Sequence, residues 1–212
     1  MRKLLRLKGS RMAFTTARRL CIRFAMTLLF AMTVLAMVPA PVWAQDTRSL
    51  VLLLRHALAP GGGDPAGFDV NDCSTQRNLN HQGQDQARDI GAQVKALGLK
   101  PTQVWSSQWC RSFETAELMD VGEVQALPAL NSFFQNRSAG PSQMAQLRAF
   151  LTDLDPTGGP YVMSSHQVVV SSIANTWVNS GDGVWLELTG DPNEPWRVYP
   201  AKTDELALPP GF

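Results

Sequence analysis

Two histidines of this chain stand directly after short apolar segments, at positions where an α/β fold can place reactive side chains. Arg55 and His56 follow the run Leu-Val-Leu-Leu-Leu at residues 50–54, and His166 follows Tyr-Val-Met-Ser-Ser at residues 161–165. If these runs form parallel strands, their last residues meet at the carboxyl edge of one sheet, where open α/β folds bind ligands. An arginine beside a histidine at this edge combines a fixed cation with a nucleophile.

Arg111 adds another cation, because it lies in the first turn of the helix that we expect after residues 103–107. The free N–H groups and the positive end of a helix favour an anion at that place. Each of these side chains alone would more often be an ordinary surface or strand-end residue. Taken together, Arg55, His56, Arg111 and His166 predict a compact site for a dianion such as phosphate, since forked arginine donors match its oxygens.

The elements that must position these residues are strands and helices in alternation. The first strand is rich in Val and Leu without alternation, as buried parallel strands are. Asn80 is a plausible N-cap for the first helix, and Gly98 follows its end. The expected strands span residues 49–55, 103–107, 123–127, 160–164, 183–189 and 196–199, and the expected helices span residues 81–97, 109–119, 142–154 and 168–178. This order predicts one three-layer α/β domain, with a mostly parallel central sheet flanked by helices.

The start of the chain has the composition of a targeting segment. Residues 1–23 carry eight Lys or Arg and no acid, a short apolar stretch follows, and Val42 and Ala44 fit a signal-peptidase site. The apolar stretch is short for a membrane span, which needs roughly 20 residues. We therefore expect a signal peptide at residues 1–44, a domain at residues 45–212, and a secreted or periplasmic protein without stable membrane insertion after cleavage. An uncleaved anchor is the alternative.

Removal of the signal changes the charge of the protein. Eight of the 19 basic residues lie in residues 1–44, so 11 basic residues remain against 18 acidic ones, a net charge of −7. An acidic body argues against a nucleic-acid partner, which requires a basic face. An anion site must then be a local cluster of arginines, and the expected ligand is a small phosphorylated substrate. Oligomeric state leaves no signature in the sequence.

The cysteines agree with export. Cys73 and Cys110 remain after the signal is removed, an even pair in an oxidising compartment. A disulfide between them is the expected arrangement and two free buried thiols are the alternative, because a bridge needs Cα atoms within about 7 Å. Such a bridge would tie the loop before Arg77 to the residue beside Arg111 and brace the phosphate site.

Several segments, taken in order, resemble the histidine phosphatase superfamily, in its phosphoglycerate-mutase-like branch 1. Leu-Arg-His-Ala at residues 54–57 resembles that family's Arg-His-Gly or Arg-His-Ala signature. Residues 77–87 resemble its arginine-leucine-threonine, glycine and glutamine-alanine segment, and residues 106–116 resemble its serine-serine, arginine and glutamate-threonine-alanine segment. Ser165 and His166 stand where the family has Gly-His. Any one motif is weak, but the ordered set is specific and covers most of the expected domain.

The resemblance implies a mechanism that these residue types support. Neutral His56 would attack phosphorus to form a phosphohistidine, which water then hydrolyses. Arg55, Arg111 and His166 would hold the phosphoryl oxygens, and Arg77 is a candidate for a further cation of the pocket. The neighbouring cations disfavour protonation of His56. No cofactor is implied, and the histidine spacings make no convincing metal site.

The sequence departs from the family pattern at the residue that protonates the leaving group. Asn131 stands where a glutamate is expected, and an amide cannot serve as a general acid. Three carboxylates of the loop after the first strand are candidates instead: Asp64, Asp69 and Asp72. We select Asp64, against the alternative that each is a solvated loop carboxylate. Glu114 is expected to be a structural partner, and His81 is expected to be exposed and without a catalytic role.

These features predict an exported phosphomonoesterase that acts through a phosphohistidine on His56. A non-catalytic protein that binds phosphate or a phosphorylated ligand is the alternative, because Asn131 leaves the acid unidentified. A phosphotransfer mutase ranks lower, since export removes the cytosolic sugar-phosphate pool. The loop at residues 59–77 is expected to cover the site and to set specificity. Its composition does not identify the substrate.

Overall fold

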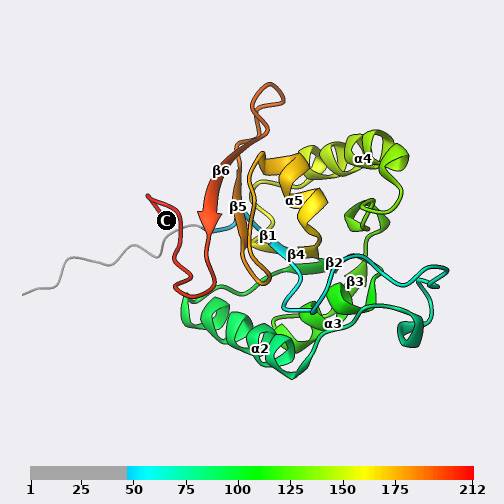
Figure 1. Ribbon diagram of the computed structural model, residues 1–212. Coiled ribbons are helices and arrows are strands. Elements are labelled where there is room, and N and C mark those ends of the chain that lie inside the picture. Colours follow the sequence, from blue (N-terminus) through cyan, green and yellow to red (C-terminus); the bar gives the residue numbers. More distant parts are fainter. Residues whose placement is uncertain (1–46) are drawn as a thin grey trace, which may run out of the picture. The chain divides into compact units, whose positions relative to one another are not determined.

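A computed structural model describes residues 47–212, in which six strands form one mixed sheet (Figure 1). The strands are β1 (Leu50–Arg55), β2 (Gln103–Ser106), β3 (Val124–Ala126), β4 (Tyr161–Ser165), β5 (Gly183–Leu188) and β6 (Trp196–Ala201). Their order in the sheet is β3-β2-β4-β1-β5-β6. The signal peptide expected at residues 1–44 lies outside the described residues.

The pairing of the strands places the predicted reactive residues at one edge of the sheet. Strands β1, β4, β2 and β3 pair in parallel, while β5 is antiparallel to both β1 and β6. In the register of β1 and β4, Arg55 lies opposite Ser165, and the His56 N–H donates to the Ser165 carbonyl at 2.8 Å. His56 and His166 therefore leave the sheet side by side, as the strand-end argument predicted.

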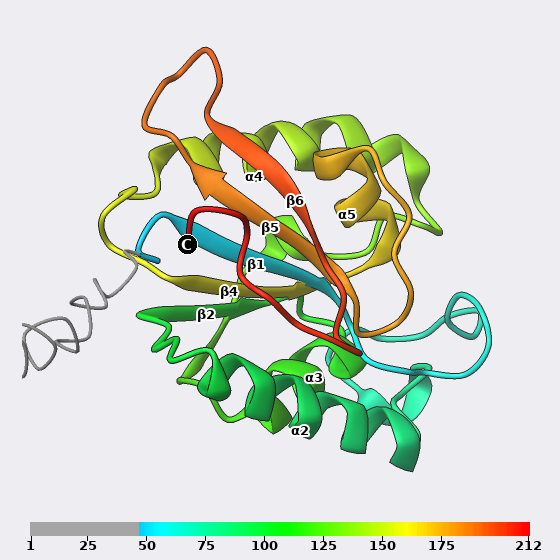
Figure 2. The same ribbon diagram turned by 90° about the vertical axis from the view of Figure 1, so that its left-hand side faces the viewer.

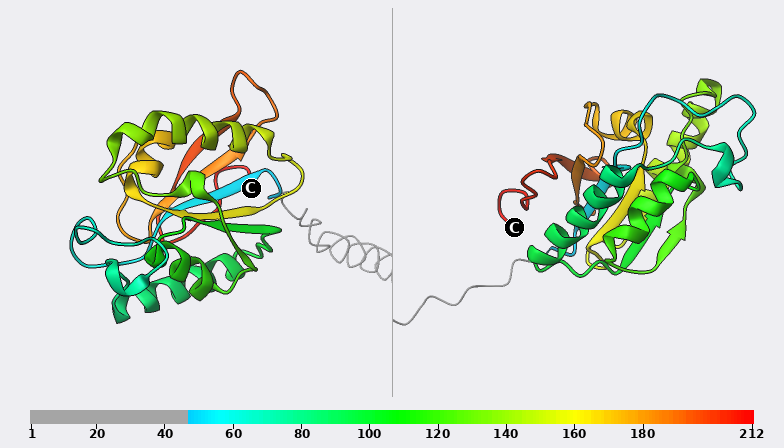
Figure 3. Two further views of the ribbon diagram at one scale, coloured as in Figure 1. Left: turned by 90° about the vertical axis from the view of Figure 1, so that its right-hand side faces the viewer. Right: turned by 60° about the horizontal axis from the view of Figure 1, so that its bottom comes forward.

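Helices cover both faces of the sheet, which confirms the expected three-layer α/β architecture (Figures 2 and 3). One face carries α2 (His81–Ala96) and α3 (Cys110–Met119), and the other carries α4 (Gly140–Asp153) and α5 (Gln167–Ala174). The C-terminal segment returns to the α2 side, where Gln93 on that helix donates to the Thr203 carbonyl and Trp185 on β5 donates to the Ala207 carbonyl.

Strand β1 is apolar on both sides because both of its faces are covered. Leu50, Leu52 and Leu54 pack in the core beneath α2 and α3, and Val51 and Leu53 pack in the core beneath α4 and α5. All five side chains are fully buried. The unbroken apolar run at residues 50–54 is thus explained by the central position of β1, because a strand that is covered on both faces needs apolar side chains on both.

Helices α2 and α3 touch at a glycine. A Cβ atom added to Gly91 would lie 1.9 Å from the carbonyl oxygen of Met119, a distance that no side chain can accept. The bare backbone at this position lets α3 lie close to α2, and it thereby fixes the helix that carries Arg111.

Several element boundaries differ from the sequence-based prediction. Helix α4 begins at Gly140, before the predicted residue 142, and β6 continues to Ala201. Helix α5 ends at Ala174 and not at residue 178, because Asn175 adopts a left-handed conformation with φ of 51°. Three short 3-10 helices were not predicted: η1 (Cys73–Thr75), η2 (Pro128–Leu130) and η3 (Arg137–Ala139). Within residues 47–212, no helix combines the length and apolar character needed to cross a membrane.

Candidate active site

The four residues predicted to form an anion site converge on one pocket. Arg55 is the last residue of β1, His56 follows it, Arg111 lies in the first turn of α3, and His166 precedes α5 directly after β4. All four line a pocket of about 470 Å³, together with Asp64 and Arg77 from the loop after β1. Residues from four separate elements thus meet where the parallel strands end.

The ring of His56 is held in one tautomer. Its side chain is 2% exposed, and Nδ1 lies 2.7 Å from the carbonyl oxygen of Ala57. Because a carbonyl only accepts, Nδ1 must carry the proton and Nε2 keeps its lone pair. The Arg111 Nε–H donates to that lone pair at 3.2 Å. The nitrogen that can act as a nucleophile therefore faces a guanidinium.

Burial and nearby charge keep His56 neutral. Burial lowers the pKa of His56, the positive charge of Arg111 lowers it further, and the resulting value is about 3. The hydrogen bond to Ala57 opposes these effects without reversing them. At neutral pH the imidazole is uncharged, which is the state that a nucleophilic histidine requires.

His166 is the second buried histidine of the pocket. It is 3% exposed, and its ring centroid lies 5.4 Å from that of His56 in an edge-to-face arrangement. Burial lowers the pKa of His166 well below its ordinary value, and so do the repulsion that would arise if His56 were also protonated and the charge of Arg111. Its Nε2 lies 2.8 Å from the Ser107 hydroxyl oxygen, which also accepts from the Trp109 N–H.

Asp64 forms a two-pronged ion pair with Arg111 inside the pocket. Arg111 Nη1 lies 2.6 Å from Oδ1 and Nη2 lies 3.1 Å from Oδ2, and the Asp64 side chain is 2% exposed. Burial alone would raise the pKa of Asp64, but the hydrogen bonds and charge of Arg111 and the N–H groups of Arg77 and Trp109 hold it below its ordinary value. An ionised, fully bonded carboxylate is poorly suited to the acid role expected from the sequence.

Two further arginines border the same pocket. Arg77 is half-buried, and its guanidinium donates to the carbonyls of Gly63, at 2.8 Å, and Ala59. Burial and the charge of Arg111 lower the pKa of Arg77 to about 10, so it is still a cation at neutral pH. Arg55 donates from Nη1 to the Val178 carbonyl at 3.2 Å. Its buried Nε has no partner among residues 47–212.

The predicted disulfide is confirmed. Cys73 in η1 and Cys110 at the start of α3 are bonded, with their Cα atoms 5.6 Å apart. The Cys110 N–H also donates to the side-chain oxygen of Gln76 at 3.0 Å, so the loop before Arg77 has two ties to α3. Sequence analysis could not identify Gln76 as a residue that supports the site, because its contact with Cys110 joins positions 34 residues apart.

Other singled-out residues lie outside the pocket. Asn131 exchanges two hydrogen bonds with Gln108, at 2.9 and 2.8 Å. Glu114 accepts from the Gln84 amide at 2.7 Å, which agrees with its expected structural role, and His81 is exposed at the start of α2. The remaining loop carboxylates, Asp69 and Asp72, are exposed and accept hydrogen bonds within their own turn. Within residues 47–212, no group of His, Cys, Asp and Glu could hold a metal ion.

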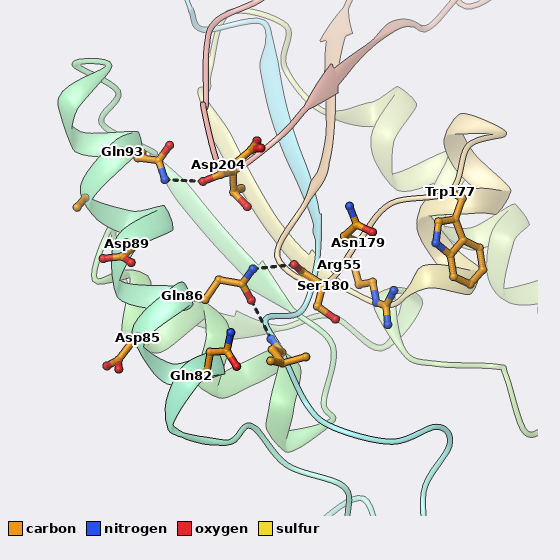
Figure 4. A pocket seen from close by; sticks show the side chains of 13 residues that line it. Arg55, Gln82, Asp85, Gln86, Asp89, Gln93, Trp177, Asn179, Ser180 and Asp204 are labelled. Carbon is orange, nitrogen blue, oxygen red and sulfur yellow. Dashed lines mark hydrogen bonds between the residues drawn. The ribbon is translucent and has the colours of Figure 1, made fainter.

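A second, wider groove adjoins the pocket (Figure 4). It has a volume of about 1260 Å³ and shares Arg55 and Trp177 with the pocket. Its other lining residues come from the start of the loop after β1, from α2, from the loop before β5 and from the segment after β6. The groove presents carboxylates and amides where the pocket presents cations, and its carboxylates are Asp85, Asp89 and Asp204. Trp177, which is 74% exposed, lines both the groove and the pocket.

Comparison with known proteins finds relatives at the level of structure. No family model matches the sequence, and no curated protein matches it. A solved structure of the protein histidine phosphatase SixA with tungstate has a TM-score of 0.53 and 19% identity, over 71% of this chain and 94% of that one. A proposed alpha-ribazole-5′-phosphate phosphatase from Escherichia coli has a TM-score of 0.56 and 14% identity, over 76% and 98%. A mycobacterial hydrolase has a TM-score of 0.53 and 12% identity, over 75% and 99%.

These similarities show that the chain shares its fold with these solved structures, one of which is named as a histidine phosphatase. The phosphoglycerate-mutase-like architecture expected from the ordered motifs is confirmed. At identities of 12 to 19% the likeness shows the fold, and the function must be argued from the site.

Proposed function

We propose that this protein is an exported phosphatase that hydrolyses a phosphate monoester through a phosphohistidine on His56. The observation that carries the proposal is the state of His56: a buried, neutral imidazole with Nδ1 anchored on Ala57 and with Nε2 directed at the Arg111 guanidinium. A nucleophile that meets a cationic group at its attacking atom is suited to an anionic electrophile.

The residues of the pocket have distinct parts in this reaction. His56 Nε2 attacks phosphorus as the bond from phosphorus to the ester oxygen breaks, and Arg55, Arg111 and His166 hold the phosphoryl oxygens. The ester oxygen leaves with the bonding electrons and takes a proton from water to give the free alcohol. Water then attacks the phosphohistidine, which releases inorganic phosphate and restores the neutral ring. Arg77 adds positive charge at the rim of the pocket.

The substrate is proposed to be a small phosphorylated molecule. The similar structures include one named as the protein histidine phosphatase SixA and one named as a proposed alpha-ribazole-5′-phosphate phosphatase, so both names refer to phosphatase activity. The Cys73–Cys110 disulfide supports a secreted or periplasmic location, because structural disulfides persist in oxidising compartments.

The proposal is tested with His56→Ala and a generic aryl phosphate such as 4-nitrophenyl phosphate. Loss of the nucleophile is expected to lower kcat by about 10³-fold or more. His81→Ala is the matched control, because this histidine is exposed on α2 and outside the pocket. Hydrolysis by His56→Ala at the wild-type rate would refute the nucleophile, as would an equal loss in the control.

A phosphate-binding protein without turnover is the second candidate. Its support is the state of the carboxylate in the pocket: among the described residues, Asp64 is the one carboxylate that lines it, and it is ion-paired. The two candidates separate in one experiment that measures both vanadate binding and hydrolysis. Tight vanadate binding with no hydrolysis of any phosphate ester would select the binding function.

A further inference from the structure

We propose that Asp64 is a positioning residue, whose carboxylate turns the Arg111 guanidinium so that two of its N–H groups face the phosphoryl group beside His56. The inference rests on the proposed function. It also gives the loop after β1 a part in the reaction that differs from proton donation.

The hydrogen bonds of Arg111 define the orientation of its guanidinium. Nη1 donates to Asp64 Oδ1 at 2.6 Å and to the Arg77 carbonyl at 3.2 Å, while Nη2 donates to Asp64 Oδ2 at 3.1 Å. Nε donates to His56 Nε2 at 3.2 Å. A guanidinium has five N–H groups, so one N–H on Nη2 is left.

The remaining N–H lies on the side of the guanidinium that faces His56. Because the carboxylate spans Nη1 and Nη2, it takes the two inner hydrogens, and the outer hydrogen of Nη2 lies beside the Nε–H. These two N–H groups form a second fork, and its Nε arm already points at the nitrogen that would be phosphorylated. A phosphoryl group that approaches Nε2 can accept from both arms through two oxygens.

Asp64 itself is held from several directions, as an orienting residue must be. Oδ2 accepts from Trp109 Nε1 at 3.0 Å, and Oδ1 accepts from the Arg77 N–H at 3.1 Å. The Gln135 side chain clamps the Asp64 backbone, accepting from its N–H at 3.0 Å and donating to its carbonyl at 3.1 Å. Partners of this kind commonly matter for function almost as much as the groups that they orient.

The ion pair also offsets the charge of a buried arginine. The Arg111 side chain is 3% exposed, and a buried cation without a counterion is strongly unfavourable. Without the Asp64 carboxylate, the guanidinium loses both the charge that stabilises it there and the two bonds that fix its rotation. The Nε–H and the free Nη2 N–H of Arg111 would then no longer be held toward the phosphoryl group beside His56.

The test compares Asp64→Asn with the wild-type protein on two esters, 4-nitrophenyl phosphate and glycerol phosphate. The aryl oxygen leaves without protonation, whereas the alkyl oxygen needs a proton donor. A positioning role predicts that kcat falls for both esters by the same factor, about 10- to 100-fold. Glu117→Gln, which removes an exposed carboxylate from α3, is the control for charge and is expected to keep wild-type kcat.

Two results would overturn the inference. A loss confined to glycerol phosphate would make Asp64 the proton donor, and wild-type kcat on both esters would leave it without a role in the reaction. Gln135→Ala serves if Asp64→Asn does not fold, because the exposed Gln135 side chain, which also lines the pocket, bonds to the backbone of Asp64 and not to its carboxylate. It should give a smaller loss that is again equal for the two esters, and an unequal loss would count against positioning.

Vanadate binding separates this inference from the proposed function, because it needs no turnover. Loss of a negative charge from a cationic pocket would by itself tighten anion binding. Weaker vanadate binding by Asp64→Asn is therefore expected only if the Arg111 guanidinium has lost its orientation. Unchanged or tighter binding contradicts the inference. Absence of hydrolysis by the wild-type protein would instead count against the proposed phosphatase.

Discussion

At the scale of single residues, the pocket is built from groups whose charge states are set by burial. His56 and His166 are neutral because desolvation and the neighbouring arginines both disfavour a further positive charge. Asp64 is ionised because its hydrogen bonds to Arg111 outweigh the effect of burial. A neutral nucleophile, His56, and an ion-paired cation, Arg111, thus lie in one small pocket at neutral pH.

The buried histidines predict a dependence of stability on pH. The pKa of His56 is about 3 in the folded protein and 6.5 in its unfolded reference, so between these values the unfolded state binds more protons. The free energy of unfolding should therefore rise with pH across this window, and His56 contributes a slope of up to about 1.4 kcal/mol per pH unit. Its stabilising contribution is fully present above pH 6.5 and is lost as the pH falls toward 3.

Urea unfolding at several pH values between 4 and 7 measures this slope. His56→Gln removes the titrating group and should flatten the dependence relative to the wild-type protein. His166 contributes in the same direction, so some slope should persist in the variant. Identical slopes for the two proteins would contradict the pKa shift of His56.

At the scale of elements, the sheet edge brings the site together and the disulfide ties its loop down. Strands β1 and β4 deliver His56 and His166 through their parallel register. Arg111 depends on α3, whose first residue is bonded to η1 through the Cys73–Cys110 disulfide. The loop after β1 runs beyond the carboxyl end of that strand in Figure 2, and it carries Asp64 and Arg77 to the pocket.

The disulfide predicts a measurable contribution to stability and to the site. The bonded cysteines are 37 residues apart, and closing a loop of that size should stabilise the fold by about 3–4 kcal/mol. The double variant Cys73→Ala/Cys110→Ala should lose this amount in urea unfolding and should bind vanadate more weakly. Dithiothreitol should reproduce both effects in the wild-type protein and have none on the variant, and unchanged stability and binding after reduction would contradict the bracing role.

At the scale of the whole molecule, a cationic pocket lies in an otherwise acidic domain. Residues 45–212 carry 11 basic and 18 acidic residues, yet Arg55, Arg77 and Arg111 gather at one edge of the sheet. The adjoining groove has the opposite character, with three carboxylates, and Trp177 stands where the two openings meet. This contrast suits a ligand whose phosphate enters the pocket while its leaving group extends toward the groove.

Trp177 is therefore predicted to bind the leaving group. Trp177→Ala should raise KM for a bulky phosphate ester by about 5- to 30-fold, the loss of roughly 1–2 kcal/mol of aromatic contact. A small ester such as methyl phosphate should be little affected. Val198→Ala, which removes an exposed apolar side chain on β6, is the matched control. An equal rise in KM for small and bulky esters would exclude this role.

The sequence by itself determined the alternation of elements and the strand-end histidines, because these follow from local apolar patterns. It offered Cys73 and Cys110 as a possible pair, and the structure decided that they are bonded because it places their Cα atoms 5.6 Å apart. The sequence failed for α5, where it predicted a helix through residue 178, because the left-handed Asn175 interrupts an apolar segment with no glycine or proline to mark the end. Only the tertiary structure shows that Asp64 is paired with Arg111. Its partner Arg111 is 47 residues away across an irregular loop, and no periodicity in a sequence records which carboxylate such a loop will bury against an arginine.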